Sequence, residues 1–307
     1  MDKVNIYSGD CIEKMKLLES NSIDLIVTDP PYNLNKDYGN LSDKQSFDEY
    51  LNFSRLWLTE AKRVLKDTGT IYVFMGVRYI SYIYSIIEQE LGFKFNSWIT
   101  WHYTQGMGKV KGFSPRHDDI LMFTKSDKFT FNLDAVRVPQ KYYRSVNNMR
   151  GANPSDVWAF SHIHYCQENR QNHPTQKPEG LYERMVLASS NEGDTVLDCF
   201  AGSGTALRVC QHLNRKCVGI EINSDYVSMI KHRLAQPFKC FDSIDERMER
   251  IPNDLTDSHI RSEYINNHKK WFLKNHDQSI EHFAANVDDK YPASSFEQIQ
   301  FQLPAAE

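Results

Sequence analysis

The sequence predicts an α/β protein built around a doubly wound, mostly parallel sheet. Short apolar runs of strand length alternate with segments of helical periodicity, which is typical of a parallel sheet covered by helices on both faces. Two strand-like runs also end in polar turns of unusual composition, Asp-Pro-Pro-Tyr at 29–32 and Phe-Ala-Gly-Ser-Gly-Thr at 200–205. In open α/β sheets, ligands bind where strands end in this way.

The first half of the chain alternates most clearly. Apolar β-like runs predict strands at 4–7, 22–28, 69–75, 94–101 and 119–124. Apolar residues near helical spacing predict helices at 11–18, 47–65 and 80–91.

The same alternation returns after residue 173. Strands are predicted at 195–200 and 216–222. Helices are predicted at 178–190, directly after the glycine-containing turn at 200–205, which is called the glycine turn below, and at 224–235. A proline near the first turn supports the helix at 178–190. A Ser or Asp cap is expected to open the helix at 224–235.

Two regions break this rhythm. Residues 126–172 are polar, aromatic and loop-like, and residues 241–307 show little apolar periodicity. The chain thus divides into segments 1–125, 126–172, 173–240 and 241–307.

Composition places the chain among globular proteins. Of its 307 residues, 40% are hydrophobic and 25% charged, and no apolar run approaches the length of a membrane span. The polar start MDKVNIYSGD does not resemble a signal peptide, so we expect a cytoplasmic location without a membrane partner. The six cysteines form no Cys-x-x-Cys pair and indicate reduced thiols. His162 and His164 lack carboxylate partners at ligand spacing, so no metal is expected.

Charge is unevenly distributed along the chain. The formal net charge is −4, yet residues 101–150 hold nine Lys or Arg against four Asp or Glu. Residues 241–307 hold thirteen acids against seven bases. Both could be ordinary solvated surface, but a basic middle also suits a groove that binds phosphates.

The stretch VTDPPYN (27–33) follows the apolar run IDLIV. Two adjacent prolines lack the N–H groups that a central sheet needs, so the strand should stop at Asp29. We expect a stiff, open turn that carries Tyr32 outward. One carboxylate, one free carbonyl and one aromatic face would then meet at the carboxyl end of the strand.

The glycine turn is a second candidate ligand site. Gly202 and Gly204 follow the strand that contains Asp198, but Leu207 replaces the third glycine of a dinucleotide motif, and no lysine of a P-loop follows. Glu221, 23 residues after Asp198, stands where an acid usually accepts two ribose hydroxyls. This half of the chain therefore suits a ligand that contains a nucleoside but no phosphate, such as S-adenosylmethionine. The alternative is a plain β-to-α turn without a ligand.

Together these residues resemble the amino-methylating DNA methyltransferases. The resemblance covers about residues 4–235 and lies in four motifs: Asp29-Pro30-Pro31-Tyr32, Phe200-Ala201-Gly202-Ser203-Gly204-Thr205, His173-Pro174-Thr175-Gln176-Lys177-Pro178, and Gly9-Asp10-Cys11. Their order is the circularly permuted order of the β group, and the likeness is greatest to adenine-N6 members. Cys199 stands where many members have proline; the loop glycines are intact. The acidic tail has no evident counterpart.

The resemblance implies a Rossmann-like methyltransferase fold that carries a target-recognition insert (126–172) between catalytic (1–125) and cofactor-binding (173–240) halves, with a helical C-terminal tail. It assigns catalysis to Asp29, Pro30, Pro31 and Tyr32. It assigns S-adenosylmethionine binding to Asp10, Cys11, His173, Thr175, Lys177, Asp198, Phe200, Gly202, Ser203, Gly204, Thr205, Glu221 and Asn223. From their residue types, we expect DNA contacts from Lys109, Lys111, Arg116, Arg144, Asn147, Asn148 and Arg150.

The expected reaction methylates an exocyclic amine of a base flipped out of double-stranded DNA. Asp29 and the Pro30 carbonyl would each accept one N–H of the amine, and Tyr32 would stack on the base. Possible partners are a second copy of the chain and a cognate restriction endonuclease; DNA binding would place the enzyme at the bacterial nucleoid.

Three alternatives remain open. The same motif serves cytosine N4, because that amine has the same two-hydrogen geometry. An RNA or protein-glutamine methyltransferase usually has Asn in place of Asp29. A nucleic-acid-binding module with a vestigial cofactor pocket is opposed by the intact Asp29, Gly202, Gly204 and Glu221.

Overall fold

The computed structural model describes residues 4–35, 44–103, 108–138, 152–163 and 170–238. The chain divides into two compact units, one formed by residues 1–132 and 156–243 and the other by residues 133–155 and 244–307. These boundaries run through the proposed target-recognition insert, so the four-part division of the sequence stays a proposal.

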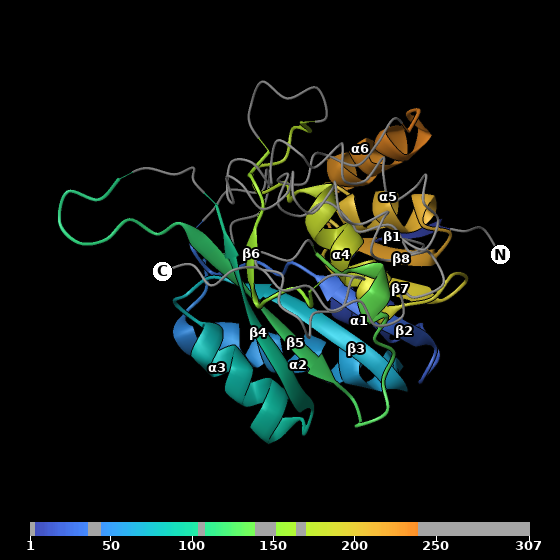
Figure 1. Ribbon diagram of the computed structural model, residues 1–307, viewed down its shortest axis with the longest axis horizontal. Helices are drawn as coiled ribbons and strands as arrows, with labels where there is room; N and C mark the ends of the chain where they lie inside the picture. The colour runs from blue at the N-terminus through green and yellow to red at the C-terminus, as the bar shows by residue number, and fades with distance from the viewer. Residues whose placement is uncertain (1–3, 36–43, 104–107, 139–151, 164–169, 239–307) are drawn as a thin grey trace, which may run out of the picture. The chain divides into compact units, whose positions relative to one another are not determined.

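The described residues of the first unit form an eight-stranded sheet in the order β1-β8-β7-β2-β3-β5-β4-β6 (Figure 1). The strands are β1 (Val4–Ser8), β2 (Ile23–Thr28), β3 (Leu65–Met75), β4 (Lys94–His102), β5 (His117–Thr124), β6 (Val157–Ala159), β7 (Thr195–Asp198) and β8 (Lys216–Glu221). Neighbouring strands are parallel except at β5, which runs antiparallel to both β3 and β4. The predicted mostly parallel sheet is therefore confirmed.

Strand β6 was not predicted. It has only three residues, inside a region whose polar composition indicates loop. Its backbone pairs in parallel with that of β4 and places Trp158 beside Trp101. Such a short edge strand is specified by its tertiary neighbours and gives no periodic signal of its own.

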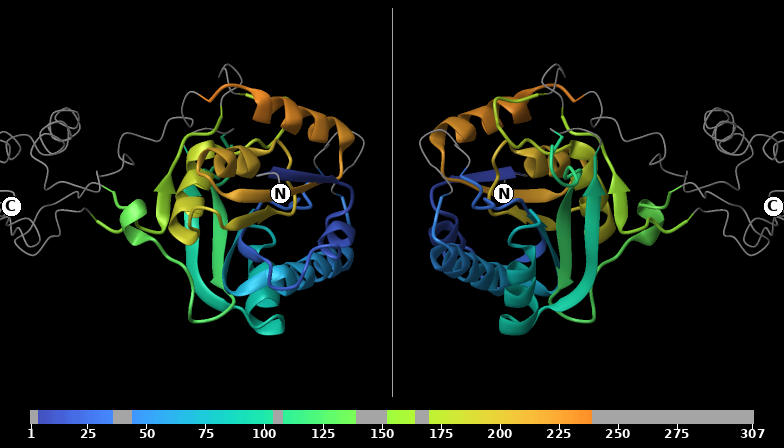
Figure 2. Two further views of the ribbon diagram at one scale, coloured as in Figure 1. Left: turned by 90° about the vertical axis from the view of Figure 1, so that its right-hand side faces the viewer. Right: turned by 90° about the vertical axis from the view of Figure 1, so that its left-hand side faces the viewer.

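Helices cover both faces of the sheet, as a doubly wound fold requires. One face carries α1 (Cys11–Met15), α2 (Phe47–Val64) and α3 (Ile80–Ser85), and the other carries α4 (Glu179–Ser189), α5 (Thr205–His212) and α6 (Ser224–Ala235). In Figure 2, α2 (light blue) and α6 (orange) lie on opposite sides of the strands. The π-helical turn η1 (Ile86–Glu90) continues α3.

Local sequence explains where these helices begin. Helix α2 starts with a capping box: the backbone N–H of Glu49 donates to the Ser46 side chain, and the backbone N–H of Ser46 donates to the Glu49 side chain. Helix α6 is capped by Asn223, whose side chain accepts from the Asp225 N–H, instead of the expected Ser or Asp.

The core lies between these layers. Leu25, Ile26 and Val27 of β2 and Ile71 and Val73 of β3 are fully buried. Such continuous apolar runs are characteristic of central parallel strands, which are covered on both faces.

The second unit is described at residues 133–138 and 152–155. It contains a 3₁₀ turn, η2 (Leu133–Ala135), and a bridge between Val138 and Ala152. The Arg137 guanidinium donates to Asp134 at 2.6 Å and to Asn153 at 2.9 Å.

Three sequence-based expectations concern membranes, thiols and metals. Within the described ranges, no helix is long and apolar enough to cross a membrane. Four described cysteines are free, buried thiols: Cys11, Cys199, Cys210 and Cys217. The same part of the chain contains no cluster of three or more His, Cys, Asp or Glu side chains that could hold a metal; His164 lies outside it.

Candidate active site

The strand order brings the two unusual turns to one edge of the sheet. Strands β2 and β7 are parallel neighbours, so Asp29 and the glycine turn both follow carboxyl ends. Across this pair, the Thr28 hydroxyl donates to the Asp198 carboxylate at 3.1 Å, although the two residues are 170 positions apart. From β2 the chain continues toward β3, and from β7 it continues toward β8, in the opposite direction. This divergence is a topological switch point, where open α/β sheets bind ligands.

A cavity of about 380 Å³ lies at this switch point. Predicted site residues on its wall are Asp10, Cys11, Asp29, Pro31, His173, Thr175, Lys177, Phe200, Gly202, Ser203, Thr205, Glu221 and Asn223. Pro30, Tyr32, Asp198 and Gly204 belong to the same turns but do not line it. The fold thus brings four separate sequence motifs to one cavity.

Asp29 is the centre of a compact polar cluster. Its Oδ1 accepts the Tyr32 hydroxyl at 2.6 Å, and its Oδ2 forms an ion pair with the Lys177 ammonium at 2.5 Å. The ammonium also lies 5.3 Å from the centre of the Tyr32 ring and 5.4 Å from that of Phe74. Both carboxylate oxygens are therefore engaged by side chains of the protein.

The expected outward direction of Tyr32 is wrong. Its side chain is 8% exposed, and the ring packs against Gly76. Burial, followed by the nearby Asp29 charge, raises the pKa of the Tyr32 hydroxyl well above its usual value. The hydroxyl therefore remains a hydrogen-bond donor that orients the carboxylate.

The turn after Asp29 is fixed by side chains from α2 and its approach. The Tyr50 hydroxyl donates to the Pro31 carbonyl at 3.0 Å. Asn33 adopts a left-handed φ of 56°, and its side chain exchanges hydrogen bonds with the Gln45 backbone at 2.7 and 3.1 Å. Gln45 and Tyr50 also line the cavity.

The glycine turn requires its glycines for packing. Gly202 and Gly204 have positive φ values of 50° and 75°. A Cβ on Gly202 would lie 3.0 Å from the His173 ring, and one on Gly204 would lie 2.9 Å from Ile230. The glycines thus leave room for the neighbouring side chains of His173 and Ile230.

Glu221 closes the other side of this turn. Its Oε2 accepts the Gly202 N–H at 2.8 Å, and its Oε1 accepts the Asn223 N–H at 2.8 Å. Burial raises the pKa of the carboxyl, while these two N–H donors oppose the rise. The carboxylate is therefore held rigidly at the cavity wall.

Asp10 and His173 contribute structure as well as cavity wall. The Asp10 carboxylate caps α1 by accepting the N–H groups of Ile12 and Glu13 at 2.9 and 3.1 Å. His173 packs edge-on against Tyr226, and its Nδ1 accepts the Thr175 N–H at 3.3 Å. Burial lowers the pKa of His173 to about 4, so its ring is neutral at pH 7.

Asp198 lies behind the cavity. It is 2% exposed, and its Oδ1 accepts the Phe200 N–H at 3.2 Å in addition to the Thr28 hydroxyl. Burial raises its pKa to about 7, well above the value near 3.9 of an unfolded aspartate.

This shift predicts a pH-dependent stability. Because the native state holds the proton more tightly than the unfolded state, the stabilisation is fully present below about pH 3.9 and is lost as pH rises through about 7. Asp198→Asn keeps the accepting oxygen without the charge. We expect its melting temperature to fall less than that of the wild type between pH 5 and pH 8; parallel pH profiles would contradict this account.

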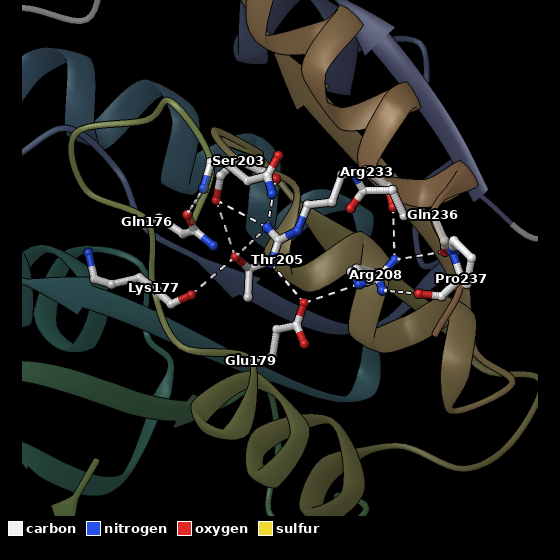
Figure 3. A network of polar contacts seen from close by, with 10 residues as sticks. Gln176, Lys177, Glu179, Ser203, Thr205, Arg208, Arg233, Gln236 and Pro237 are labelled. Atoms are coloured by element: carbon white, nitrogen blue, oxygen red, sulfur yellow. Dashed lines mark hydrogen bonds and ion pairs between the residues drawn. The ribbon is translucent and has the colours of Figure 1, made fainter. Parts of the chain in front are cut away.

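A buried ion cluster joins the glycine turn to α4 and α6 (Figure 3). The Arg233 guanidinium, on α6, donates to the Ser203 carbonyl at 2.8 Å and to the Thr205 hydroxyl at 3.1 Å. It also pairs with Glu179, at the start of α4, at 2.8 Å, and Arg208 of α5 pairs with the same oxygen at 3.2 Å. Ser203 and Thr205 are thus positioned from behind the cavity wall.

Several cavity residues were not predicted as site residues. Phe53, on α2, packs against Phe200 with 6.1 Å between ring centres. The ring of Trp57, on the same helix, lies 5.4 Å from that of Phe200. Tyr182, Ile222 and Tyr226 also line the cavity. Helical periodicity places such aromatic residues in the core, and only the tertiary fold shows that one edge of that core faces a cavity.

The predicted DNA contacts are only partly described. Lys109 and Lys111 are exposed, and Arg116 is half-buried. Arg144, Asn147, Asn148 and Arg150 lie outside the described residues. All seven roles stay predictions.

Comparisons with known proteins match most of the chain. The family model N6_N4_Mtase, described as DNA methylase, matches residues 23–232. The type II methyltransferase M.HpaI of Haemophilus parainfluenzae is 67% identical over 287 residues, covering 93% of this chain and 91% of that protein. The DNA adenine methyltransferase YhdJ of Escherichia coli (strain K12) is 37% identical over 243 residues, covering 75% and 82% of the two chains.

Solved structures share the fold. The cytosine-N4-specific PvuII DNA methyltransferase matches with a TM-score of 0.64 at 20% identity, covering 76% of this chain and 86% of that chain. The M1.HpyAVI–SAM complex matches with a TM-score of 0.57 at 26% identity, covering 76% of this chain and 100% of that chain.

The M.HpaI match is long enough to extend into the acidic segment after residue 240, for which the sequence alone suggested no counterpart.

Proposed function

Because the chain belongs to the N6/N4 DNA methylase family, we propose that it methylates the N6 amine of adenine in double-stranded DNA. The family and the cofactor predicted from the motifs are confirmed: the chain is an S-adenosylmethionine-dependent, site-specific DNA methyltransferase. Adenine as the target is the finer proposal. It is supported by 37% identity, over three quarters of the chain, to a protein named as a DNA adenine methyltransferase.

The arrangement around Asp29 supports transfer to an amine. S-adenosylmethionine, when bound, supplies a methyl group already activated by its sulfonium, so the chain's own task is to hold and polarise the acceptor. The Asp29 carboxylate accepts an N–H of the amine and stabilises the positive charge that develops on nitrogen. The Tyr32 hydroxyl, 2.6 Å from Oδ1, keeps that carboxylate oriented during the reaction.

We infer that Lys177 moves away from Asp29 during the reaction. Its ammonium pairs with Asp29 Oδ2, and without this cation the carboxylate charge is free to stabilise the positive charge that develops on the target nitrogen. A lysine side chain has the rotamer freedom for this movement. Lys177 would then contact the bound cofactor, to whose binding the resemblance of its motif assigns it.

The remaining cavity suits the nucleoside of the cofactor. Glu221 lies where it can accept the ribose hydroxyls, and Phe53 and Phe200 offer apolar surface at the wall. Access of adenine to Asp29 requires the base to leave the duplex, at a cost of a few kcal/mol of unstacking.

Similarity to other proteins is the basis for two further proposed partners, a restriction endonuclease and a second copy of the chain. Relatives named as type II methyltransferases support a cognate restriction endonuclease. A homodimer stays a prediction from the resemblance.

Nucleoside analysis of methylated DNA tests the proposed target. Plasmid DNA would be incubated with the enzyme and tritium-labelled S-adenosylmethionine, digested, and separated by chromatography. We expect the label in N6-methyl-2′-deoxyadenosine. Label in N4-methyl-2′-deoxycytidine would instead support the alternative target, and sequencing of the same DNA would identify the recognition site.

A further inference from the structure

The loop between β4 and β5 exposes two large apolar side chains. In its described part, residues 108–116, Val110 is 100% exposed and Phe113 is 99% exposed. Lys109 and Lys111 alternate with them, and this part contains no acidic residue. Two almost fully exposed apolar side chains in one short basic loop form a candidate contact surface for a partner.

The topology places this loop at the active-site edge. Strands β2 and β3 are parallel, and β3 and β4 each run antiparallel to β5, so β4 ends at the same edge as β2. The Tyr103 N–H donates to the Arg116 carbonyl at 2.9 Å and holds the two stems of the loop together. Figure 1 shows the described residues of the loop, in green, projecting away from the ends of β4 and β5.

The charge of the loop suits a polyanion. Two exposed lysines beside an aromatic ring, without a nearby acid in the loop, match a phosphate backbone that flanks stacked bases. Proteins that distort duplexes commonly insert an apolar side chain between base steps. A base that leaves the stack creates such a gap.

We propose that Phe113 enters the DNA stack at the gap left by the everted adenine, while Lys109 and Lys111 contact the flanking phosphates. The proposal rests on the proposed function. Phe113 replaces stacking lost by the neighbouring bases and so favours the open duplex. Val110, also on the exposed side of the loop, is the matched apolar residue for comparison.

The experiment compares two duplexes that carry the mapped recognition site. In one, the target adenine is paired with thymine; in the other, it faces an abasic position and needs little unpairing. For Phe113→Ala we expect single-turnover methylation of the paired duplex to fall by about 10- to 100-fold, with near wild-type rates on the abasic duplex. The 2-aminopurine fluorescence that reports eversion should fall in parallel, and Phe113→Trp should restore both.

Control variants separate this role from others. Lys109→Ala should weaken binding to both duplexes. It should also reduce the slope of the logarithm of the binding constant against the logarithm of the salt concentration by about one. Val110→Ala should change eversion much less than Phe113→Ala.

Three results would overturn the proposal. They are an equal loss on both duplexes, no loss on either, or a change in sedimentation showing that Phe113 instead binds a second copy of the chain. If the proposed function itself fails, the wild-type enzyme will label neither adenine, which distinguishes the two failures.

Discussion

Asp29→Asn is expected to lower the single-turnover rate of methyl transfer by about 10²- to 10³-fold while the cofactor still binds. The amide keeps the shape of the side chain and an oxygen that Lys177 can reach. It loses the negative charge that faces the developing cation on the target nitrogen, and a preorganised group of this kind contributes about 10²- to 10³-fold to a rate. Rapid-quench transfer of labelled methyl to DNA measures the effect.

Cofactor affinity provides the control for this variant. Asp29 lines the cavity but is assigned no hydrogen bond to the cofactor, so the dissociation constant of S-adenosylmethionine should change by less than about tenfold, or 1.4 kcal/mol. Loss of cofactor binding together with activity would assign Asp29 to the cofactor instead. Retention of the rate would remove it from the reaction.

Arg233→Met is expected to cause the largest loss of stability. Arg233 is 2% exposed, pairs with Glu179 and donates to Ser203 and Thr205. Removing one partner of a buried ion cluster typically lowers the free energy of unfolding by about 3–5 kcal/mol. Because Ser203 and Thr205 line the cavity, the cofactor dissociation constant should also rise.

Arg55→Met is the matched control. Arg55 forms a two-point ion pair with Glu90, but the two side chains are 42% and 45% exposed. Exposed pairs contribute little, so urea denaturation should show a much smaller loss. Equal losses in the two variants would mean that the buried cluster does not hold the glycine turn.

Strong local signals predicted much of this molecule. Continuous apolar runs gave β2 and β3, and the two prolines after Asp29 placed the end of β2 correctly. The same kind of reading failed for β6, whose three residues are extended only because β4 lies beside them. It also failed for Tyr32, because its ring is buried against Gly76 at the end of β3, a contact that exists only in the folded protein.

Long-range polar contacts were the least predictable part of the site. The Lys177–Asp29 pair joins residues 148 positions apart, and the motif alone pointed Lys177 toward the cofactor. Glu179, Arg208 and Arg233 each look like ordinary charged helix residues until α4, α5 and α6 are packed together. Their role depends on which helix ends meet, and that is a property of the topology.

The most direct test is a crystal structure of the enzyme with sinefungin, a cofactor analogue, and a duplex containing the mapped target site. The account predicts that the target amine lies within about 3.2 Å of an Asp29 oxygen, with the Lys177 ammonium displaced from it. A structure in which Lys177 still occupies Asp29 while the target base binds elsewhere would contradict it.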